Sequence, residues 1–360
     1  MCKAESENGR SRARLLVLGL LVVAWSCGSP SANRTPNVDV DVADVVTDRP
    51  LELTDEEILD VEAEDAAELR ADASAELEDD DATEEVDDTA DLVDDSVPEL
   101  SCNGSPTLCQ RPFDEVAVAC THNGFATEED GFWPPNQLYS MTHQLEDGVR
   151  CLMLDFHYND EGVPSLCHGD CYWGQRPLTD GLEEIRKYLD EDPGAVVTLI
   201  LENYIALEDI DAAMATAGLR ELAYAHPIGT PWPTLQELID SGKRVVVLGP
   251  NGGEAYPWLL DNWAEAFETD WSNQVPEDFT CDVNRGSWDN PLFILNHFVE
   301  NPLPEPSQAA TVNFNPFFLD RAQECFAERE HIPNFVTVDF YDVGDVFDVV
   351  DALNTGLELP

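Results

Sequence analysis

The sequence predicts an α/β fold, a single, distorted (β/α)8 barrel of the TIM type, in residues 101–360. Strand-like apolar runs alternate with helical patterns through this region, as expected for parallel strands joined by helices. The runs are rich in Val, Leu, Ile and Phe with little polar alternation, which is typical of strands covered on both faces. A length of about 260 residues is also usual for one such barrel.

Eight apolar runs are the candidate strands. They lie at residues 115–121, 149–155, 164–166, 196–202, 244–248, 264–269, 292–296 and 334–340. Helical patterns between them are expected at residues 137–146, 180–190, 207–225, 234–241, 316–328 and 346–354. Thr179 is a suitable N-cap for the second of these helices, and Pro193 with Gly194 ends it.

The first four runs each lead to a residue that can take part in chemistry. These residues are His122, Asp155, His168 and Glu202, in chain order. Because the carboxyl ends of parallel barrel strands open on one face, we expect the four side chains to meet there. Two imidazoles suit proton transfer, and neighbouring oxygen ligands suit a hard cation.

Residues 1–27 resemble a bacterial lipoprotein signal. Basic residues precede an apolar stretch from Leu15 to Trp25 that is too short to span a bilayer comfortably. We expect Cys27 to be the lipidated N-terminus of an exported, membrane-anchored lipoprotein of the cell envelope or surface. The alternative is a signal peptide that is cut nearby, with Cys27 incidental.

Residues 28–100 have the composition of a disordered acidic linker. From Ser31 to Leu100 the chain carries 27 Asp or Glu and three Arg, with no aromatic residue and no Cys. Such a segment buries too little apolar area to offset its ordering entropy, so we expect an extended tether. A cation-binding or spacer role for this tether remains an alternative.

The acidic balance also limits the partners of the protein. The formal net charge is −56, and no basic stripe exists that could neutralise phosphates along a nucleic acid. We therefore expect no nucleic-acid partner, and we expect a monomer.

Eight cysteines lie in residues 101–360, and an even number in an exported domain predicts disulfides. The expected pairs are Cys102 with Cys109, Cys167 with Cys171, and Cys281 with Cys325. Cys120 and Cys151 lie at matching depth on adjacent predicted strands, where a bridge and two buried thiols fit the pattern equally well. The cysteines are too scattered for a zinc site.

Several motifs together resemble the X-region of phosphatidylinositol-specific phospholipase C. They are Thr121-His122-Asn123, residues 144–155, Leu166-Cys167-His168-Gly169, residues 196–203, residues 232–235 and residues 333–341. The resemblance covers nearly all of residues 102–353 and is closest to the exported branch of the family in bacteria and plants. It implies a TIM barrel and a phosphoric diester hydrolase.

The resemblance also implies roles for the two histidines. His122 would be the general base that takes the proton from the inositol 2-hydroxyl as this oxygen attacks phosphorus. His168 would be the general acid that protonates the departing diacylglycerol oxygen, and the product would be a cyclic inositol phosphodiester. Asp339, at the end of the last run, either orients His122 or caps a loop. A phosphoinositide or related phosphodiester lipid is the implied partner.

A Ca2+ cofactor is implied as well, with Asn123, Asp155 and Glu202 as its ligands. Calcium-independent bacterial members carry Arg at the position of Asp155 and Lys at that of Glu202, whereas this chain has oxygen ligands. Many calcium-dependent members carry Glu at the position of Met153. Its absence here either weakens Ca2+ binding or leaves a ligand position to water.

Substrate contacts are predicted for Arg176, His297, Tyr341 and Trp173, although ordinary packing explains the aromatic residues nearly as well. Two other functions remain open. One is a glycerophosphodiester-type phosphodiesterase that acts on another headgroup. The other is a non-catalytic binding module at the cell surface.

Overall fold

The computed structural model describes residues 101–356, which are built around one sheet of eleven strands. The strands are β1 Val118–Thr121, β2 Cys151–Tyr158, β3 Pro164–Leu166, β4 Arg176–Pro177, β5 Val197–Asn203, β6 Val245–Gly249, β7 Leu259–Asp261, β8 Ala266–Glu268, β9 Arg285–Gly286, β10 Leu292–Asn296 and β11 Phe335–Val338. The expected leader, the lipidated Cys27 and the acidic linker at residues 28–100 lie outside the described residues.

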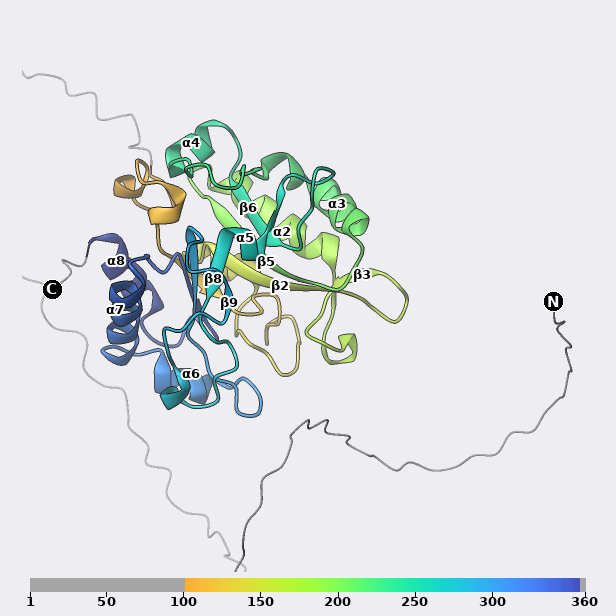
Figure 1. The fold of residues 1–360 in the computed structure, drawn as a ribbon. Coiled ribbons are helices and arrows are strands. Elements are labelled where there is room, and N and C mark those ends of the chain that lie inside the picture. The colour runs from red at the N-terminus through yellow and green to blue at the C-terminus, as the bar shows by residue number, and fades with distance from the viewer. Residues whose placement is uncertain (1–100, 357–360) are drawn as a thin grey trace, which may run out of the picture. The chain divides into compact units, whose positions relative to one another are not determined.

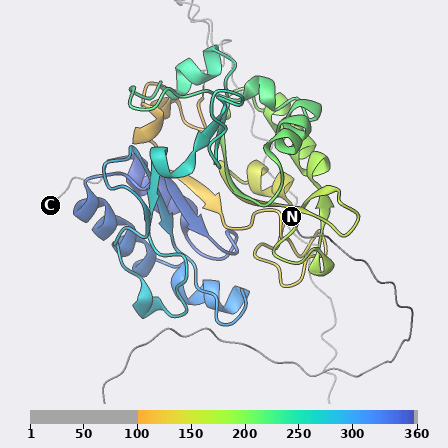
Figure 2. The same ribbon diagram turned by 45° about the vertical axis from the view of Figure 1, so that its right-hand side comes forward.

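Helices alternate with the strands along the chain. They are α1 Met141–Glu146, α2 Leu178–Glu191, α3 Leu207–Thr216, α4 Leu235–Asp240, α5 Asn262–Glu265, α6 Pro306–Val312, α7 Phe317–Arg329 and α8 Val346–Asn354. In Figures 1 and 2, α2 and α3 flank the part of the sheet that contains β5, whereas α7 and α8 flank the opposite part. Thr179 lies inside α2 and not at its N-cap, since the helix begins at Leu178.

Eight strands within residues 101–356 form one continuous run of parallel pairs, which confirms the expected α/β barrel class. In order, these are β7, β6, β5, β2, β1, β11, β10 and β8. The sheet order begins at β7 and ends at β9, so the described sheet curls without closing, and this opening is its distortion from a regular barrel. Every residue of β6 and β10 is buried, as coverage on both faces requires.

The third expected strand exists but is not a barrel strand. β3 pairs antiparallel with β2, and β4 pairs antiparallel with β3, so residues 159–177 form an excursion from the parallel part of the sheet. The eighth parallel strand is instead β7, which the sequence pattern did not reveal. β7 has only three residues, too few to show the two-residue alternation of a strand, and it follows a stretch that contains Gly252, Gly253 and Pro257.

Two expected helices are shorter than predicted. The helix expected at residues 207–225 ends at Thr216, and Gly218 turns the chain away with a φ of 72°. The helix expected from residue 137 begins at Met141, because Gln137 forms an isolated parallel bridge with Thr127. The short helices α5 and α6 were not expected.

Four disulfides lie in the described residues. They join Cys102 with Cys109, Cys120 with Cys151, Cys167 with Cys171, and Cys281 with Cys325. Three are the pairs expected from the sequence. The fourth resolves the open case, because its two cysteines are register partners on β1 and β2.

No helix within residues 101–356 has both the length and the apolar character that a bilayer-spanning segment needs.

Candidate active site

The carboxyl ends of the parallel strands surround a pocket of about 730 Å³. Five residues of the predicted site line it, together with Met153: His122, Asn123, Asp155, His168 and Glu202. They come from β2, β5 and the loops that follow β1 and β3. The fold thus brings the predicted catalytic histidines and the predicted metal ligands to one place.

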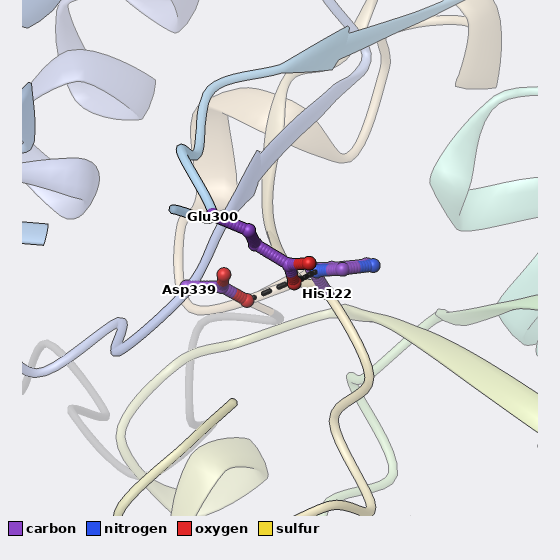
Figure 3. A group of neighbouring side chains, drawn as sticks. All are labelled: His122, Glu300 and Asp339. Carbon is purple, nitrogen blue, oxygen red and sulfur yellow. Dashed lines mark hydrogen bonds and ion pairs between the residues drawn. The ribbon is translucent and has the colours of Figure 1, made fainter. Parts of the chain in front are cut away.

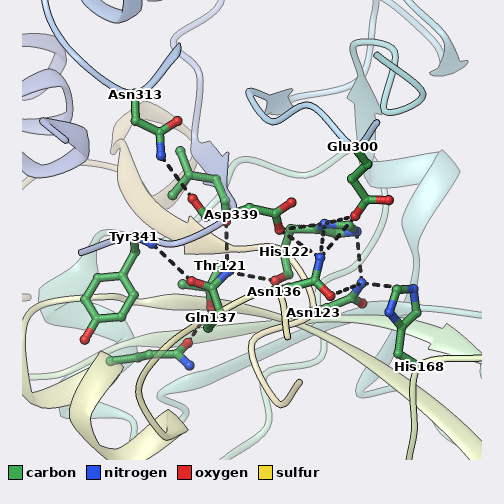
Figure 4. A network of polar contacts seen from close by, with 12 residues as sticks. Thr121, His122, Asn123, Asn136, Gln137, His168, Glu300, Asn313, Asp339 and Tyr341 are labelled. Carbon is green, nitrogen blue, oxygen red and sulfur yellow. Dashed lines mark hydrogen bonds and ion pairs between the residues drawn. The ribbon is translucent and has the colours of Figure 1, made fainter. Parts of the chain in front are cut away.

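His122 follows β1 and lies at the centre of a polar network (Figure 4). Its Nδ1 is 3.0 Å from Asp339 Oδ1 and 3.6 Å from Glu300 Oε1. The buried Asn136 side chain donates to both carboxylates, at 3.1 Å to Glu300 and 3.0 Å to Asp339. The ring of His122 stacks on Phe298 with the centroids 4.0 Å apart. These contacts fix the orientation of the imidazole.

The carboxylates around His122 control its protonation. Burial opposes the charged form, but the negative charges of Asp339, Glu300 and Asp155 outweigh it and raise the pKa of His122 to about 9. Burial likewise raises the pKa of Glu300, although the charge of His122 opposes this. When the ring is neutral and donates Nδ1–H to Asp339, Nε2 carries the free lone pair and can accept a proton.

His168 reaches the pocket by a route that differs from the expected one. It follows β3, which runs antiparallel to β2, and therefore does not stand at the end of a barrel strand. The β2–β3 hairpin instead folds back, and the Cys167 amide donates to the Asp155 carbonyl at 3.4 Å. The disulfide from Cys167 to Cys171 closes the loop around His168. Burial, assisted by the charge of His122, lowers the pKa of His168.

Asn123 lies between the two histidines. Its Nδ2 is 3.2 Å from His122 Nε2 and 3.4 Å from His168 Nε2. The residue has a φ of 45°, a left-handed conformation that Asn adopts more easily than most residues. The Nε2 atoms of both histidines therefore converge on one amide (Figure 4), and both imidazoles can reach one ligand bound beside it.

Asp155 and Glu202 form a pair of carboxylates at the pocket. Burial, followed by the charge of Glu202, raises the pKa of Asp155 to about 8. Within residues 101–356 the Asp155 carboxylate has no hydrogen-bond or ion-pair partner, and Glu202 accepts a hydrogen bond from Tyr204. Two neighbouring carboxylates without a cationic partner fit a hard cation such as Ca2+. Asn123 lines the same pocket and can add an amide oxygen. Met153 lines the same wall and adds no oxygen ligand.

The four predicted substrate contacts do not lie in the pocket. Arg176 forms ion pairs with Glu184 at 2.7 Å and with Asp130 at 3.1 Å, which hold its guanidinium elsewhere. Trp173 is half exposed and packs against Trp133, with the ring centroids 5.1 Å apart. The structure therefore does not support a pocket contact for either residue.

His297 and Tyr341 also lie outside the pocket, for a reason of strand geometry. Asn296, the last residue of β10, lines the pocket, and side chains alternate along a strand, so the next residue faces the other way. His297 is fully buried there and stacks on Phe318 with the centroids 3.8 Å apart. The Tyr341 hydroxyl donates to Asp147 at 2.6 Å. Neither residue is therefore among those that line the pocket.

Sequence reasoning missed three residues that surround His122. Glu300, Phe298 and Asn136 lie on loops, where no periodic pattern marks a residue that faces a site. No signal in the sequence identified them.

The far wall of the pocket was missed as well. Arg285 is the one Arg or Lys among the described residues that line the pocket, and it lies over the Trp263 ring at 4.5 Å and pairs with Glu268. Asn296 donates to Glu268 at 3.1 Å. Because Glu268 and Asn296 end β8 and β10, the strand-end rule that identified the metal ligands would have found them too.

Known proteins resemble this chain over most of the described residues. Residues 108–354 match the family model described as PI-PLC X 1. PI-PLC X domain-containing protein 1 of Arthroderma benhamiae is 31% identical over 281 residues, which cover 71% of this chain and 90% of the relative. A PI-PLC X domain-containing protein of Arabidopsis thaliana is 27% identical over 286 residues, which cover 68% of this chain and 62% of the relative.

Two further comparisons concern a secreted relative and a solved structure. An uncharacterized secreted protein of Arthroderma benhamiae is 28% identical over 286 residues, covering 70% of this chain and 64% of the relative. A phosphatidylinositol-specific phospholipase C of S. aureus aligns at 12% identity with a TM-score of 0.49, covering 68% of this chain and 94% of the other. The family model and the 31% identical relative, each matching more than two thirds of the chain, show that this protein belongs to the PI-PLC X-domain family.

Proposed function

We propose that this protein is an exported phosphoric diester hydrolase of the phospholipase C type, with His122 as general base and His168 as general acid. The observation that carries the proposal is the convergence of both Nε2 atoms on Asn123, at 3.2 and 3.4 Å, in the pocket that also holds Asp155 and Glu202. Cleavage of a phosphodiester needs a general base and a general acid together. The attacking hydroxyl is neutral and must lose a proton, and the departing alkoxide is a poor leaving group unless it gains one.

In the proposed reaction, His122 Nε2 removes the proton of a hydroxyl adjacent to the phosphodiester. The freed oxygen attacks phosphorus and forms a cyclic phosphodiester, while the bond to the leaving oxygen breaks and His168 donates a proton to that oxygen. Asp339 stabilises the imidazolium of His122 through its hydrogen bond to Nδ1. Each proton transfer contributes about 10²–10⁴-fold to the rate.

The pKa shifts favour both proton transfers thermodynamically. A raised pKa makes His122 a strong base, and a lowered pKa makes the His168 imidazolium a strong acid. The productive state, with His122 neutral and His168 charged, is consequently a minor state near neutral pH. A positive charge bound at Asp155 would offset the attraction of that carboxylate for the His122 proton and make the neutral base more abundant.

Asn123, Asp155 and Glu202 would hold Ca2+ in this site. The ion would supply positive charge against the phosphoryl oxygens, whose negative charge must be stabilised in the transition state. The protein residues supply the oxygen ligands. Burial, followed by the charge of Glu202, raises the pKa of Asp155, and a bound cation would oppose both effects.

The substrate class that we propose is a phosphoinositide or a related phosphodiester lipid. Export, followed by anchoring through a lipid on Cys27, would place the domain beside a membrane, and one relative is named a secreted protein. The strongly acidic chain would be repelled by an anionic membrane, so Ca2+ or exposed aromatic residues would have to mediate contact. We propose a monomer that has no nucleic-acid partner.

The test is phosphodiesterase turnover on phosphatidylinositol vesicles by the unsubstituted protein and by two variants, His122→Ala and His168→Ala. We expect each variant to lose at least about 100-fold in rate, since each removes one proton-transfer group. His143→Ala is the control, because this half-exposed histidine pairs with Glu129 and does not line the pocket. Turnover that survives both pocket substitutions refutes the mechanism. Absence of turnover on a panel of phosphodiesters favours a binding module.

A further inference from the structure

His122, Glu300 and Asp339 bring three ligand atoms together on one side of the imidazole (Figure 3). One nitrogen or oxygen atom from each residue lies within 4.8 Å of the other two. The nitrogen that faces the two carboxylates is Nδ1, whereas Nε2 faces Asn123. This group therefore shares no residue with the proposed Ca2+ ligands, and it uses the ring nitrogen of His122 that does not face Asn123.

Two of the three spacings in the group are close to those of a zinc centre. His122 Nδ1 is 3.0 Å from Asp339 Oδ1 and 3.6 Å from Glu300 Oε1. Two ligands at ~2.0–2.1 Å from a tetrahedral zinc ion lie ~3.3 Å from each other, so both distances differ from the ideal by only about 0.3 Å. Small side-chain movements would open the position for the ion.

The surroundings of the group also match a metal site. Asp339 Oδ2 is buried and has no hydrogen-bond partner in residues 101–356, so one carboxylate oxygen lacks compensation. Phe298 stacks on the imidazole and orients it. Asn136 Nδ2 donates to the same Glu300 and Asp339 oxygens and lies 3.4 Å from His122 Nδ1, so this amide must turn aside when an ion binds. The Glu300 side chain is 31% exposed, so an ion and a water ligand can enter from that side.

We propose that His122, Glu300 and Asp339 form a second metal site, which takes Zn2+ or a similar transition-metal ion. One imidazole nitrogen with two carboxylates is a ligand set that zinc accepts, leaving a fourth position for water. Ca2+ prefers oxygen ligands alone and in larger number, so it binds this group poorly.

The ion would change the chemistry available to His122. Because the metal takes the Nδ1 lone pair, the single proton of a neutral ring sits on Nε2, where the ring cannot accept another proton. This consequence rests on the proposed function: if His122 is the general base, Zn2+ inhibits turnover even when Ca2+ is present. Metal binding itself does not depend on any activity.

The experiment uses the full chain. The protein is stripped of metal with chelator and then kept in excess Ca2+, so that Ca2+ occupies the acidic groups outside the proposed zinc site. ZnCl2 is titrated by calorimetry, and CoCl2 is added in parallel to record the visible absorption of a tetrahedral centre. We expect one strong Zn2+ site per chain and a tetrahedral cobalt spectrum. Glu300→Gln and Asp339→Asn should each weaken Zn2+ binding more than ~10-fold, since even an outer-shell change costs that much.

Glu129→Gln is the matched control. Glu129 also places a carboxylate oxygen 3.0 Å from a histidine Nδ1, in this case the Nδ1 of His143. Among the described residues, however, the Glu129–His143 pair belongs to no group of three ligands. The substitution should leave Zn2+ affinity unchanged. Failure to bind Zn2+, or equal binding by Glu300→Gln and the unsubstituted protein, overturns the site.

Activity is measured separately on phosphatidylinositol vesicles in Ca2+, with and without saturating Zn2+. Loss of turnover on zinc binding supports the inhibitory role, and full turnover with the site occupied overturns it. A protein that binds Zn2+ but cleaves no phosphodiester under any condition refutes the proposed function while the metal site stands.

Discussion

Asp155 and Glu202 lie directly beside each other on β2 and β5, because these parallel strands are in register at this pair. Two carboxylates in such a position repel each other, and burial increases the cost of the charge on Asp155. A bound cation is the simplest way to make this arrangement favourable.

Calcium affinity should respond to the number of carboxylates on β2. Met153 lies two residues before Asp155, and both line the pocket, as side-chain alternation along a strand requires. We expect Met153→Glu to tighten Ca2+ binding by about 10-fold, or ~1.4 kcal/mol, because ligand charge sets calcium affinity. Asp155→Asn should weaken binding by a similar factor. Calorimetry measures both, with Glu208→Gln on α3 as the control. A tighter complex in Asp155→Asn would place the ion elsewhere.

The protonation of His122 should depend on Asp339. In the Ca2+-free protein we expect the His122 ring to titrate at a pKa of about 9, since the nearby carboxylates outweigh burial. Asp339→Asn should bring that pKa down by more than ~1 unit, because it removes the closest charge. Two-dimensional NMR of the ring protons follows the titration. Asp147→Asn, which changes the partner of Tyr341, is the control. A midpoint near 6.5 in the unsubstituted protein would contradict this electrostatic description.

Thermal stability without Ca2+ should fall as the pH rises from 6 to 9. The folded pKa of Asp155, about 8, and that of His122, about 9, lie above the ordinary values of 3.8 and 6.5. Both groups hold protons more tightly in the folded state, so the free energy of unfolding decreases as the pH rises through each folded pKa. Calorimetric scans at each pH in chelator measure the fall in Tm. Asp155→Asn, which cannot ionise, should reduce this fall, and an unchanged slope would show that Asp155 does not contribute.

Two disulfides should differ in what they stabilise. The Cys167–Cys171 bridge spans four positions around His168, whereas the Cys281–Cys325 bridge spans 44. Loop-closure entropy predicts a loss of ~2 kcal/mol for the short bridge and ~4 kcal/mol for the long one. Replacing both cysteines of the short bridge with serine should mainly reduce turnover, because the loop that carries His168 is no longer closed. Replacing both cysteines of the long bridge with serine should mainly lower the Tm. Unchanged turnover without the short bridge would mean that other contacts hold His168.

Much of the barrel could be predicted, because buried parallel strands are continuous apolar runs that are easy to recognise. The ends of such runs identified Asp155 and Glu202, since parallel strands present their carboxyl ends on one face. β7 was not found, because three residues carry too little pattern. The direction of β3 was also not predictable, since an apolar run of three residues does not show whether its partner is parallel or antiparallel.

The remaining part of the site depends on contacts between distant loops. Glu300 and Asn136 contact the His122 network through side chains whose positions no local pattern records. His297 does not line the pocket, because it follows a strand end by one position and one position reverses the side on which a side chain lies. Arg176 does not line the pocket, and acidic residues close to it in space pair with its guanidinium.

The most direct test of the account is the identity of the product formed from phosphatidylinositol vesicles, resolved by phosphorus NMR with Ca2+ and with chelator. We predict a cyclic inositol phosphodiester signal that appears in Ca2+, disappears in chelator and is absent in His122→Ala. A glycerol phosphate product, or a cyclic product that forms equally well in chelator, would contradict the proposed chemistry and its metal requirement.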